Sequence, residues 1–159
     1  MTYDLLINLY QKEEFYSNDI LIKDKDVVVK RLLSPNADDL IEFVESNFSK
    51  KWASEIKAAV YKSNPTCFVA VKNSEIIGFS CYDATAKSYF GPTGVSQTYR
   101  KNNIGQVLFL KTLDALKHDG YGYAIVGGVS RQVESFYSKY VICMKLSFEK
   151  NLYKRLINY

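Results

Sequence analysis

Residues 88–119, SYFGPTGVSQTYRKNNIGQVLFLKTLDALKHD, decide the fold of this chain. The stretch begins with aromatic and β-branched residues that predict a strand at 89–97, which Gly91-Pro92-Thr93-Gly94 interrupts. Because proline cannot donate to a sheet ladder, this interruption indicates an edge or a bulge. A polar, basic turn is predicted at 98–103. From Ile104 onward, apolar residues recur at helical spacing on more than one face, which is typical of a buried helix.

The basic turn has the properties of a phosphate site. The first backbone N–H groups of a helix have no internal partners, and the helix dipole adds partial positive charge. Arg100 and Lys101 supply full charges there, and Gly105 lets a ligand approach the backbone closely. A solvated turn before a core helix is the competing interpretation. His118, the only histidine, lies beside Lys117 at the predicted helix end, where both suit the negative pole of the dipole.

The order of residues around this turn resembles a known motif. Val95, Arg100–Gly105 and Leu108 follow one another as in motif A of the GNAT (Gcn5-related) N-acetyltransferases of the bacterial type. That motif is a valine-bearing strand followed by Arg/Gln-x-x-Gly-x-Gly/Ala. Downstream, residues 121–128 resemble the family's next strand, and residues 134–139 resemble its motif B, a short helix with an aromatic–tyrosine pair. The resemblance extends from about residue 27 to residue 146.

The resemblance implies one GNAT-like α/β domain over residues 1–159. A mixed, mostly antiparallel sheet would contain a central parallel strand–helix–strand unit, and helices would flank the sheet. The crossover of the parallel unit is expected to be right-handed. Residues 1–26 are the least readable part of the chain and are treated as an N-terminal extension. Within them, Tyr3–Tyr10 has enough Leu and Ile for either a strand or a helix.

Local signals predict the elements that precede the decisive stretch. Ser34-Pro35 suits the start of a helix, with Ser34 as N-cap and Pro35 at the first helical position. Asn64-Pro65 ends a second helix. In chain order, the other predicted elements are a hairpin with strands at 20–22 and 27–33, the second helix at about 49–61, and a hairpin with strands at 66–71 and 76–82.

Composition narrows the class of protein. The chain has 159 residues, 47% of them hydrophobic, which is enough for one domain with a real core. The net charge of +4 is scattered, so it suits an anionic small ligand as well as nucleic acid. Cys67, Cys81 and Cys143 lie far apart in the sequence and are expected to be reduced core residues of a cytoplasmic protein, without a metal site. No signal peptide, membrane span or repeat is recognisable.

The resemblance implies acetyl-CoA as cosubstrate. Its pyrophosphate would lie on the N–H groups at the start of the helix, and its pantetheine arm would pair with the strand near Val95. The N–H near Val95 would polarise the thioester oxygen. Many relatives carry an asparagine that contacts the arm where this chain has Ser130. The expected cofactor-binding residues are Val95, Arg100, Lys101, Asn102, Asn103, Ile104, Gly105, Gln106 and Ser130.

Acetyl transfer to an amine needs a neutral amine, a donor for the developing oxyanion and a proton for the leaving thiolate. Tyr137 matches the tyrosine that often protonates the thiolate in the family, and a phenol with a pKa of about 10 is protonated at neutral pH. A core aromatic is the alternative. Asp83 and Glu55 are the candidate general bases, each with a solvated carboxylate as its alternative. Glu55 follows Trp52 by three positions, so both project from one face of a helix. The resemblance implies that this helix borders the acceptor cleft, where the pair would attract an ammonium group.

These residues predict an enzyme that transfers an acetyl group from acetyl-CoA to a primary amine of a small molecule or amino sugar by direct attack. Asn103, Ser130 and Val141 depart from the family pattern, which leaves a non-catalytic acyl-CoA-binding domain open, and a protein acceptor is also open. An interaction module would need aromatics interleaved with basic residues on an exposed face, whereas the aromatics here fall in apolar runs. The expected partner is a small amine, without nucleic acid or membrane, and a homodimer is left open.

Overall fold

The computed structural model describes residues 2–17 and 19–158, and a seven-stranded sheet in the order β2-β3-β4-β5-β6-β1-β7 forms the frame of these residues. The strands are β1 (Tyr3–Asn8), β2 (Val28–Arg31), β3 (Cys67–Lys72), β4 (Glu75–Tyr82), β5 (Tyr89–Val95), β6 (Tyr123–Val129) and β7 (Cys143–Leu146). The α-helices are α1 (Ala37–Asn47), α2 (Lys50–Glu55), α3 (Lys57–Val60), α4 (Ile104–His118) and α5 (Arg131–Ser138). Short 3-10 helices form η1 (Ser34–Asn36), η2 (Gln97–Tyr99) and η3 (Leu152–Arg155).

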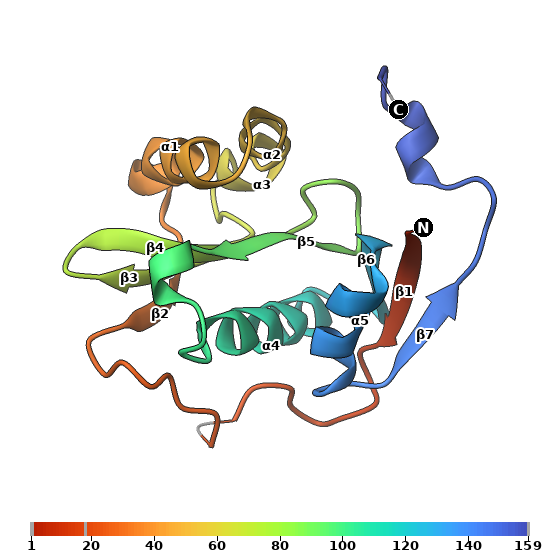
Figure 1. The fold of residues 1–159 in the computed structure, drawn as a ribbon, viewed down its shortest axis with the longest axis horizontal. Coiled ribbons are helices and arrows are strands. Elements are labelled where there is room, and N and C mark those ends of the chain that lie inside the picture. Colours follow the sequence, from red (N-terminus) through yellow and green to blue (C-terminus); the bar gives the residue numbers. More distant parts are fainter. Residues whose placement is uncertain (1, 18, 159) are drawn as a thin grey trace.

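The sheet is mixed and mostly antiparallel. Among the described strands only β5 and β6 pair in parallel, and α4 connects them. Helices α1, α2 and α3 cover one face of the sheet and α4 and α5 the other (Figure 1). This arrangement confirms the predicted fold class. No helix in the described ranges is both long and apolar enough to cross a membrane.

Residues 3–8, for which the sequence allowed either a strand or a helix, form β1 inside the sheet. β1 pairs antiparallel with β6 on one side and with β7 on the other. Its side chains alternate as a strand requires, because Leu5 and Ile7 are fully buried against the side that carries α4. An N-terminal strand therefore separates β6 from the C-terminal strand β7.

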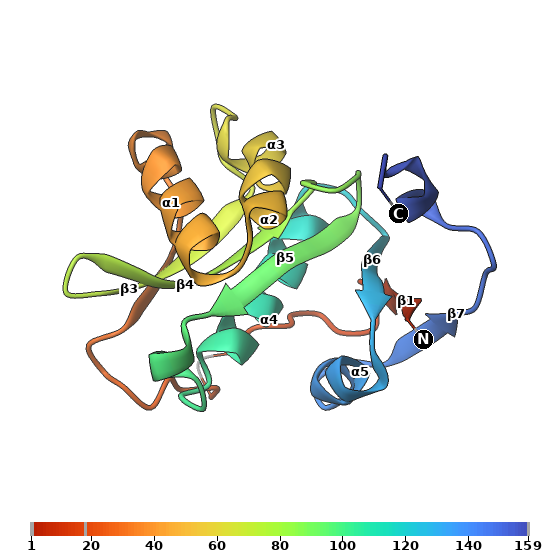
Figure 2. The ribbon, with the colours of Figure 1, turned by 45° about the horizontal axis from the view of Figure 1, so that its top comes forward.

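β5 and β6 separate toward their carboxyl ends. They are paired only at Tyr89 with Ile125 and at Phe90 with Val126. Beyond these pairs, β5 continues through Gly91-Pro92, whereas β6 enters an irregular pairing with β1 near Gly127. In α/β folds, ligands bind outside the carboxyl ends of parallel strands, where neighbouring strands diverge. The fork between β5 and β6 (Figure 2) is therefore the place to look for a site.

Two apolar layers hold the fold together. α4 is buried along most of its length, as its pattern predicted, and packs mainly on β3, β4 and β5. On the other face, α1 and α2 cover β3 and β4 with an aromatic cluster that includes Phe48 and Phe79. The tip of the Phe48 ring lies against Gly94 of β5, since a Cβ built there would come within 2.6 Å of Phe48 Cε1. A glycine in this strand lets α1 approach the sheet.

Several predicted boundaries are wrong in detail. Residues 20–22 form no strand, and β2 pairs with β3 instead of with them. Ser34 is not an N-cap, because Leu33 holds that position before η1, and no side chain caps η1. The helix predicted at 49–61 is divided at Ile56 into α2 and α3, although Ser49 does cap its start by accepting from Trp52 N–H at 3.1 Å.

Cys67 and Cys81, distant in the sequence, face each other in the core. They are directly opposed across the β3–β4 hairpin, and their Sγ atoms lie 3.1 Å apart. Both thiols are free and fully buried, as the sequence predicted. Burial raises the pKa of the Cys81 thiol well above its usual range, with a further contribution from the hydrogen bond to Cys67. Hairpin register, which residue spacing does not reveal, brings the two side chains together.

Candidate functional site

The N-terminus of α4 carries backbone N–H groups without partners. The first helical bond runs from Val107 N–H to Asn103 O at 3.2 Å, so the N–H groups of residues 104–106 precede it. Among the described residues no side chain caps this helix. The Asn103 amide points away and donates to Leu21 O at 2.9 Å. The helix start is therefore suited to an anion such as a pyrophosphate.

Asn103 takes the place of a glycine in this turn. Its φ of 65° lies in the left-handed region, which asparagine tolerates better than most other side chains. Lys101 has a similar φ of 69°. The family motif has a glycine at position 103, and its replacement by asparagine predicts a turn that fits a phosphate less closely. The backbone conformation that a glycine would favour is nevertheless present.

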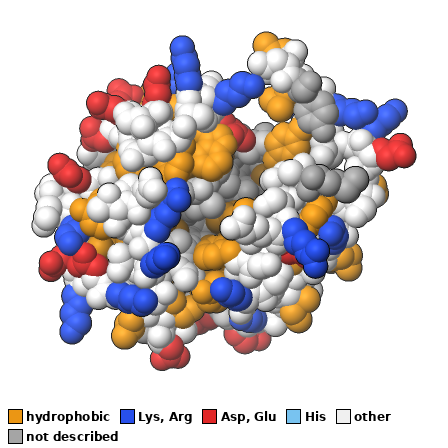
Figure 3. Space-filling view, viewed as in Figure 1, with side chains coloured by type: hydrophobic (Ala, Val, Ile, Leu, Met, Phe, Trp, Pro, Cys, Tyr) orange, Lys and Arg blue, Asp and Glu red, His pale blue; other side chains and the backbone are white. Residues whose placement is uncertain are grey.

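Two basic side chains, Arg100 and Lys101, lie at the turn and form no ion pair with a described acidic residue. Both side chains are exposed. Arg100 donates through Nε to Val95 O at 3.2 Å, which places the guanidinium between the end of β5 and the start of α4. Figure 3 shows Lys and Arg side chains over the segment between these two elements. This charge distribution favours an anionic ligand.

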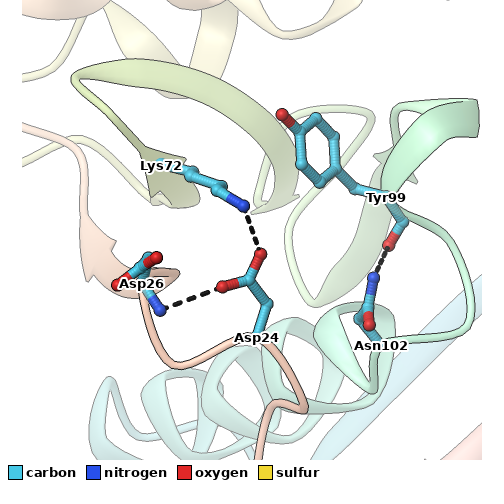
Figure 4. Close-up of polar contacts among 5 residues, drawn as sticks. All are labelled: Asp24, Asp26, Lys72, Tyr99 and Asn102. Carbon is cyan, nitrogen blue, oxygen red and sulfur yellow. Dashed lines mark hydrogen bonds and ion pairs between the residues drawn. The ribbon is translucent and has the colours of Figure 1, made fainter.

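The turn is held from behind by the loop that precedes β2 (Figure 4). Asn102 Nδ2 donates to Tyr99 O at 3.2 Å, and Asn102 O accepts from Lys23 N–H at 3.0 Å. One residue later, Asp24 forms an ion pair with Lys72 of β3 at 2.5 Å. The hydrogen bond from Lys72 is the main cause that lowers the pKa of the Asp24 carboxyl, followed by the N–H of Asp26. These contacts fix the turn to the sheet.

The Asp24–Lys72 ion pair gives a pH-dependent prediction. A carboxyl whose pKa is lowered by folding adds stability above its unfolded pKa of about 3.9, and this is lost as pH falls through the lower folded value. Asp24→Asn is therefore expected to lower Tm at about pH 7 and to have less effect at about pH 3. Thermal unfolding across this range measures the difference. Asp26→Asn, which keeps the backbone donor, is the control, and a pH-independent effect of Asp24→Asn would contradict the prediction.

β5 presents backbone groups to the fork. Ser96 N–H donates to Ile77 O at 2.8 Å, and Val95 is opposite Gly78 in the register of β4 and β5. Backbone groups alternate in direction along an antiparallel strand, so the N–H and C=O of Val95 and Thr93 point away from β4. β6 has already separated from β5 at this level. The Val95 N–H and the backbone groups of Thr93 are therefore placed to pair with an extended ligand, whereas Val95 O accepts from Arg100 Nε.

Gly105 leaves space between β5 and α5. A Cβ built there would meet Phe136 Cζ at 3.7 Å and Val95 Cγ2 at 3.9 Å, both ordinary contacts. A methyl group would therefore fit, but a larger side chain would extend between these two residues. The basic turn, the outward groups of β5 and Gly105 are neighbours, because Val95 contacts both Arg100 and the position of Gly105. Sequence reasoning missed Thr93 and Phe136, although the two-residue period from Val95 indicates the first.

Comparison with known proteins agrees with this geometry. Residues 34–139 match the profile of the family described as Acetyltransferase (GNAT) family. The chain belongs to this family. The GNAT resemblance predicted from the sequence is thus confirmed, and acetyl-CoA is the cosubstrate of the family. Among curated proteins, none matches the chain.

Solved structures of GNAT proteins share the fold. The chain is 18% identical, with a TM-score of 0.71, to a glucosamine N-acetyltransferase region in a fungal multi-domain β-N-acetylglucosaminidase, covering 91% of this chain and 20% of that one. It is 18% identical, with a TM-score of 0.56, to an aminoglycoside acetyltransferase from an uncultured soil metagenomic sample. This match covers 81% of this chain and 98% of that one. A GNAT N-acetyltransferase from Escherichia coli, solved in complex with CoA, is 17% identical to the chain, with a TM-score of 0.50. The match covers 60% of this chain and 59% of that one. At such identities the likeness is one of fold.

Tyr137 lies on α5 inside an aromatic cluster. Its side chain is 5% exposed, and its ring centroid lies 4.7 Å from that of Phe109 and 5.9 Å from that of Phe90. The hydroxyl donates to no described residue. Burial, and then the charge of Cys143, raise the pKa of the Tyr137 phenol well above its ordinary value. The ring is a core residue, and the use of its hydroxyl as an acid stays a prediction.

Ser130 and Asp83 have structural contacts. Ser130 is the N-cap of α5, and its Oγ accepts from Val133 N–H at 3.4 Å. Asp83 Oδ1 accepts from Ser88 N–H and Oδ2 from the Tyr121 hydroxyl, both at 2.8 Å. The two Asp83 contacts close the loop where β5 and β6 begin, at the opposite end of the strands from the fork. The geometry therefore favours a structural part for Asp83 over that of a base.

Glu55 and Trp52 diverge in their surroundings. Trp52 is half-buried in the aromatic cluster, with its ring centroid 5.4 Å from that of Phe48. Glu55, the last residue of α2, accepts from Thr85 Oγ1 at 2.5 Å. Trp52 thus anchors the helix, whereas Glu55 faces the loop between β4 and β5. Glu55, like Asp83, is thus held by the loop that joins β4 to β5.

Proposed function

We propose that this protein transfers the acetyl group of acetyl-CoA to a primary amine of a small molecule or amino sugar. The observation that carries the proposal is the row of unpartnered N–H groups at the start of α4, next to the outward backbone groups of Val95. The unpartnered N–H groups of α4 suit an anionic pyrophosphate, and the backbone groups of Val95 suit a ligand arm that carries amides. Between these two places Gly105 has no side chain that would block a ligand.

Direct attack needs no covalent enzyme intermediate. The neutral amine attacks the thioester carbon, the carbonyl oxygen gains negative charge, and the C–S bond breaks as the thiolate leaves. In this proposal the Val95 N–H stabilises the oxyanion and Tyr137 protonates the thiolate. The nitrogen loses its extra proton to water, and Tyr137 regains a proton from water. A phenol is already protonated at neutral pH, and burial, which raises the pKa of Tyr137, keeps the proton in place.

A small acceptor is supported by the kind of proteins that share the fold. One is described as a glucosamine N-acetyltransferase region and another as an aminoglycoside acetyltransferase. Both names denote small, cationic and hydroxylated acceptors. A non-catalytic acyl-CoA-binding domain and a protein N-acetyltransferase are the competing functions, and each predicts a different result in the same assay.

The test is thiol release from acetyl-CoA in the presence of glucosamine, sisomicin, putrescine and lysine-containing peptides. We expect release that depends on one of the small amines, with the N-acetyl product identified by mass spectrometry. Release that depends only on a peptide would support a protein acceptor instead. CoA binding measured by calorimetry, without release in any of these mixtures, would contradict catalysis and support the binding domain.

A further inference from the structure

β6 has a bulge where it leaves β5. In the register of β1 and β6, Tyr3 is opposite Val129 and Leu5 is opposite Val126, so Asp4 alone faces Gly127 and Gly128. Gly128 has a φ of +65°, which favours glycine, and its N–H donates to Asp4 Oδ1 at 3.0 Å. Bulges of this kind redirect backbone and side chains at the rims of sheets. Here the bulge fixes a carboxylate beside the fork.

Asp4 is a buried carboxylate without a cationic partner among the described residues. Its side chain is 8% exposed, and the single ion pair in residues 2–17 and 19–158 joins other groups. From these residues, only the Gly128 N–H donates to the carboxylate, and Oδ2 receives nothing. Among the described residues no side-chain oxygen is both fully buried and unbonded, so Oδ2 keeps some contact with solvent. A carboxylate with a reachable oxygen and no ion pair can receive a cation.

The carboxylate lies on the face of the sheet opposite α4. Leu5 and Ile7 pack against α4, and side chains alternate along a strand, so Asp4 faces the other side. That side carries α2, and the C-terminal segment with η3 lies on the same side (Figures 1 and 2). Cosubstrate would occupy the α4 side of the fork. Asp4 is therefore on the side that remains for an acceptor.

Tyr153 of η3 covers this place. A Cβ built on Gly127 would lie 2.9 Å from Tyr153 Cζ and closer still to its hydroxyl, so the phenol rests directly on β6. Burial, then the charges of Asp4 and Glu55, raise the pKa of the Tyr153 phenol. The phenol is therefore near both carboxylates. At its other end the segment is joined to α2, where Lys51 Nζ donates to Asn158 Oδ1 at 3.2 Å.

We infer that Asp4, beneath Tyr153, binds the cationic ammonium group of the acceptor. The inference deepens the proposed function and rests on it. The Asp4 carboxylate attracts the ammonium by charge, and the phenol supplies an aromatic surface and a hydroxyl for a hydroxylated amine. The bound ammonium loses a proton to water before it attacks, and the N-acetylated product, which carries no charge at this nitrogen, is released from Asp4.

The test compares binding of charged amines with that of their neutral acetylated forms. Asp4→Asn keeps an oxygen to accept from Gly128 N–H but removes the charge. We expect the affinity for glucosamine, sisomicin or putrescine, measured calorimetrically with CoA present, to fall at least about tenfold. The affinities for CoA and for N-acetylglucosamine stay unchanged, and Tm stays equal because asparagine keeps the bond from Gly128 N–H. Glu75→Gln, an exposed carboxylate on the β3–β4 hairpin, is the control.

Each outcome of this test decides a separate claim. Unchanged amine affinity in folded Asp4→Asn, or equal binding of charged and acetylated forms by the wild-type protein, overturns the site. If Asp4→Asn does not fold, Tyr153→Phe replaces it, and an unchanged amine affinity in that variant overturns the site instead. Charge-dependent binding through Asp4 with no turnover of any amine by the wild-type protein would leave the site standing and contradict the proposed function.

Discussion

Gly105→Trp is expected to abolish CoA binding while the protein stays folded. A Cβ at this position makes only ordinary contacts with Phe136 and Val95, at 3.7 and 3.9 Å, so the start of the side chain is accommodated. The indole would then fill the space between β5 and α5 that the cosubstrate needs. We expect CoA affinity to fall at least about 100-fold, which corresponds to roughly 2.7 kcal/mol. Calorimetry with CoA and thermal unfolding measure the two properties.

Two further glycine variants separate exclusion of the ligand from damage to the fold. Gly105→Ala adds only the methyl group that fits, and alanine favours a helix by about 1 kcal/mol over glycine. Its Tm is therefore expected to hold or rise, with a smaller loss of CoA affinity. Gly122→Trp places the same indole where a Cβ meets nothing within 4 Å, and should leave CoA binding intact. Normal CoA affinity in folded Gly105→Trp would exclude the path between Val95 and Phe136.

The strand–turn–helix unit at 88–119 was predictable because its signals are local. The helical period begins at Ile104 and the helix ends at His118, as apolar spacing and the basic end residues predicted. The interruption at Gly91-Pro92 also marks where β5 stops pairing with β6. Each of these features depends on residues that are neighbours in the sequence. The resemblance to the GNAT family predicted the order in which these strands and helices follow one another along the chain.

Features that depend on distant pairing were not predictable. Nothing near Asp4 indicates that β1 would lie between β6 and β7, since strand order is set by contacts across the whole chain. The same holds for Tyr153, which reaches Gly127 from the C-terminal segment. Gly127-Gly128 was the one available signal, because a glycine pair inside a strand indicates a bulge or a close approach. Here it is both.

Tyr137→Phe is expected to lower kcat about 100-fold, with little change in CoA affinity, if the phenol protonates the leaving thiolate. The ring would keep its packing on Phe109 and Phe90. Because the hydroxyl donates to no described residue, its removal is expected to leave Tm unchanged. Steady-state kinetics with the amine found in the panel assay, together with thermal unfolding, measure both. Tyr140→Phe, which also removes a phenol hydroxyl near the end of α5, is the matched control.

The pH dependence adds a second criterion for Tyr137. Burial raises the pKa of this phenol, so the protonated donor persists as pH rises beyond the ordinary value of about 10. Loss of the donor therefore cannot produce a decline of kcat below that pH in the wild-type enzyme. A wild-type turnover rate in Tyr137→Phe would mean that water protonates the thiolate and that Tyr137 serves only the core. A lowered kcat with an unchanged Tm would leave proton donation as the remaining difference, because packing and cosubstrate binding are the same in both proteins.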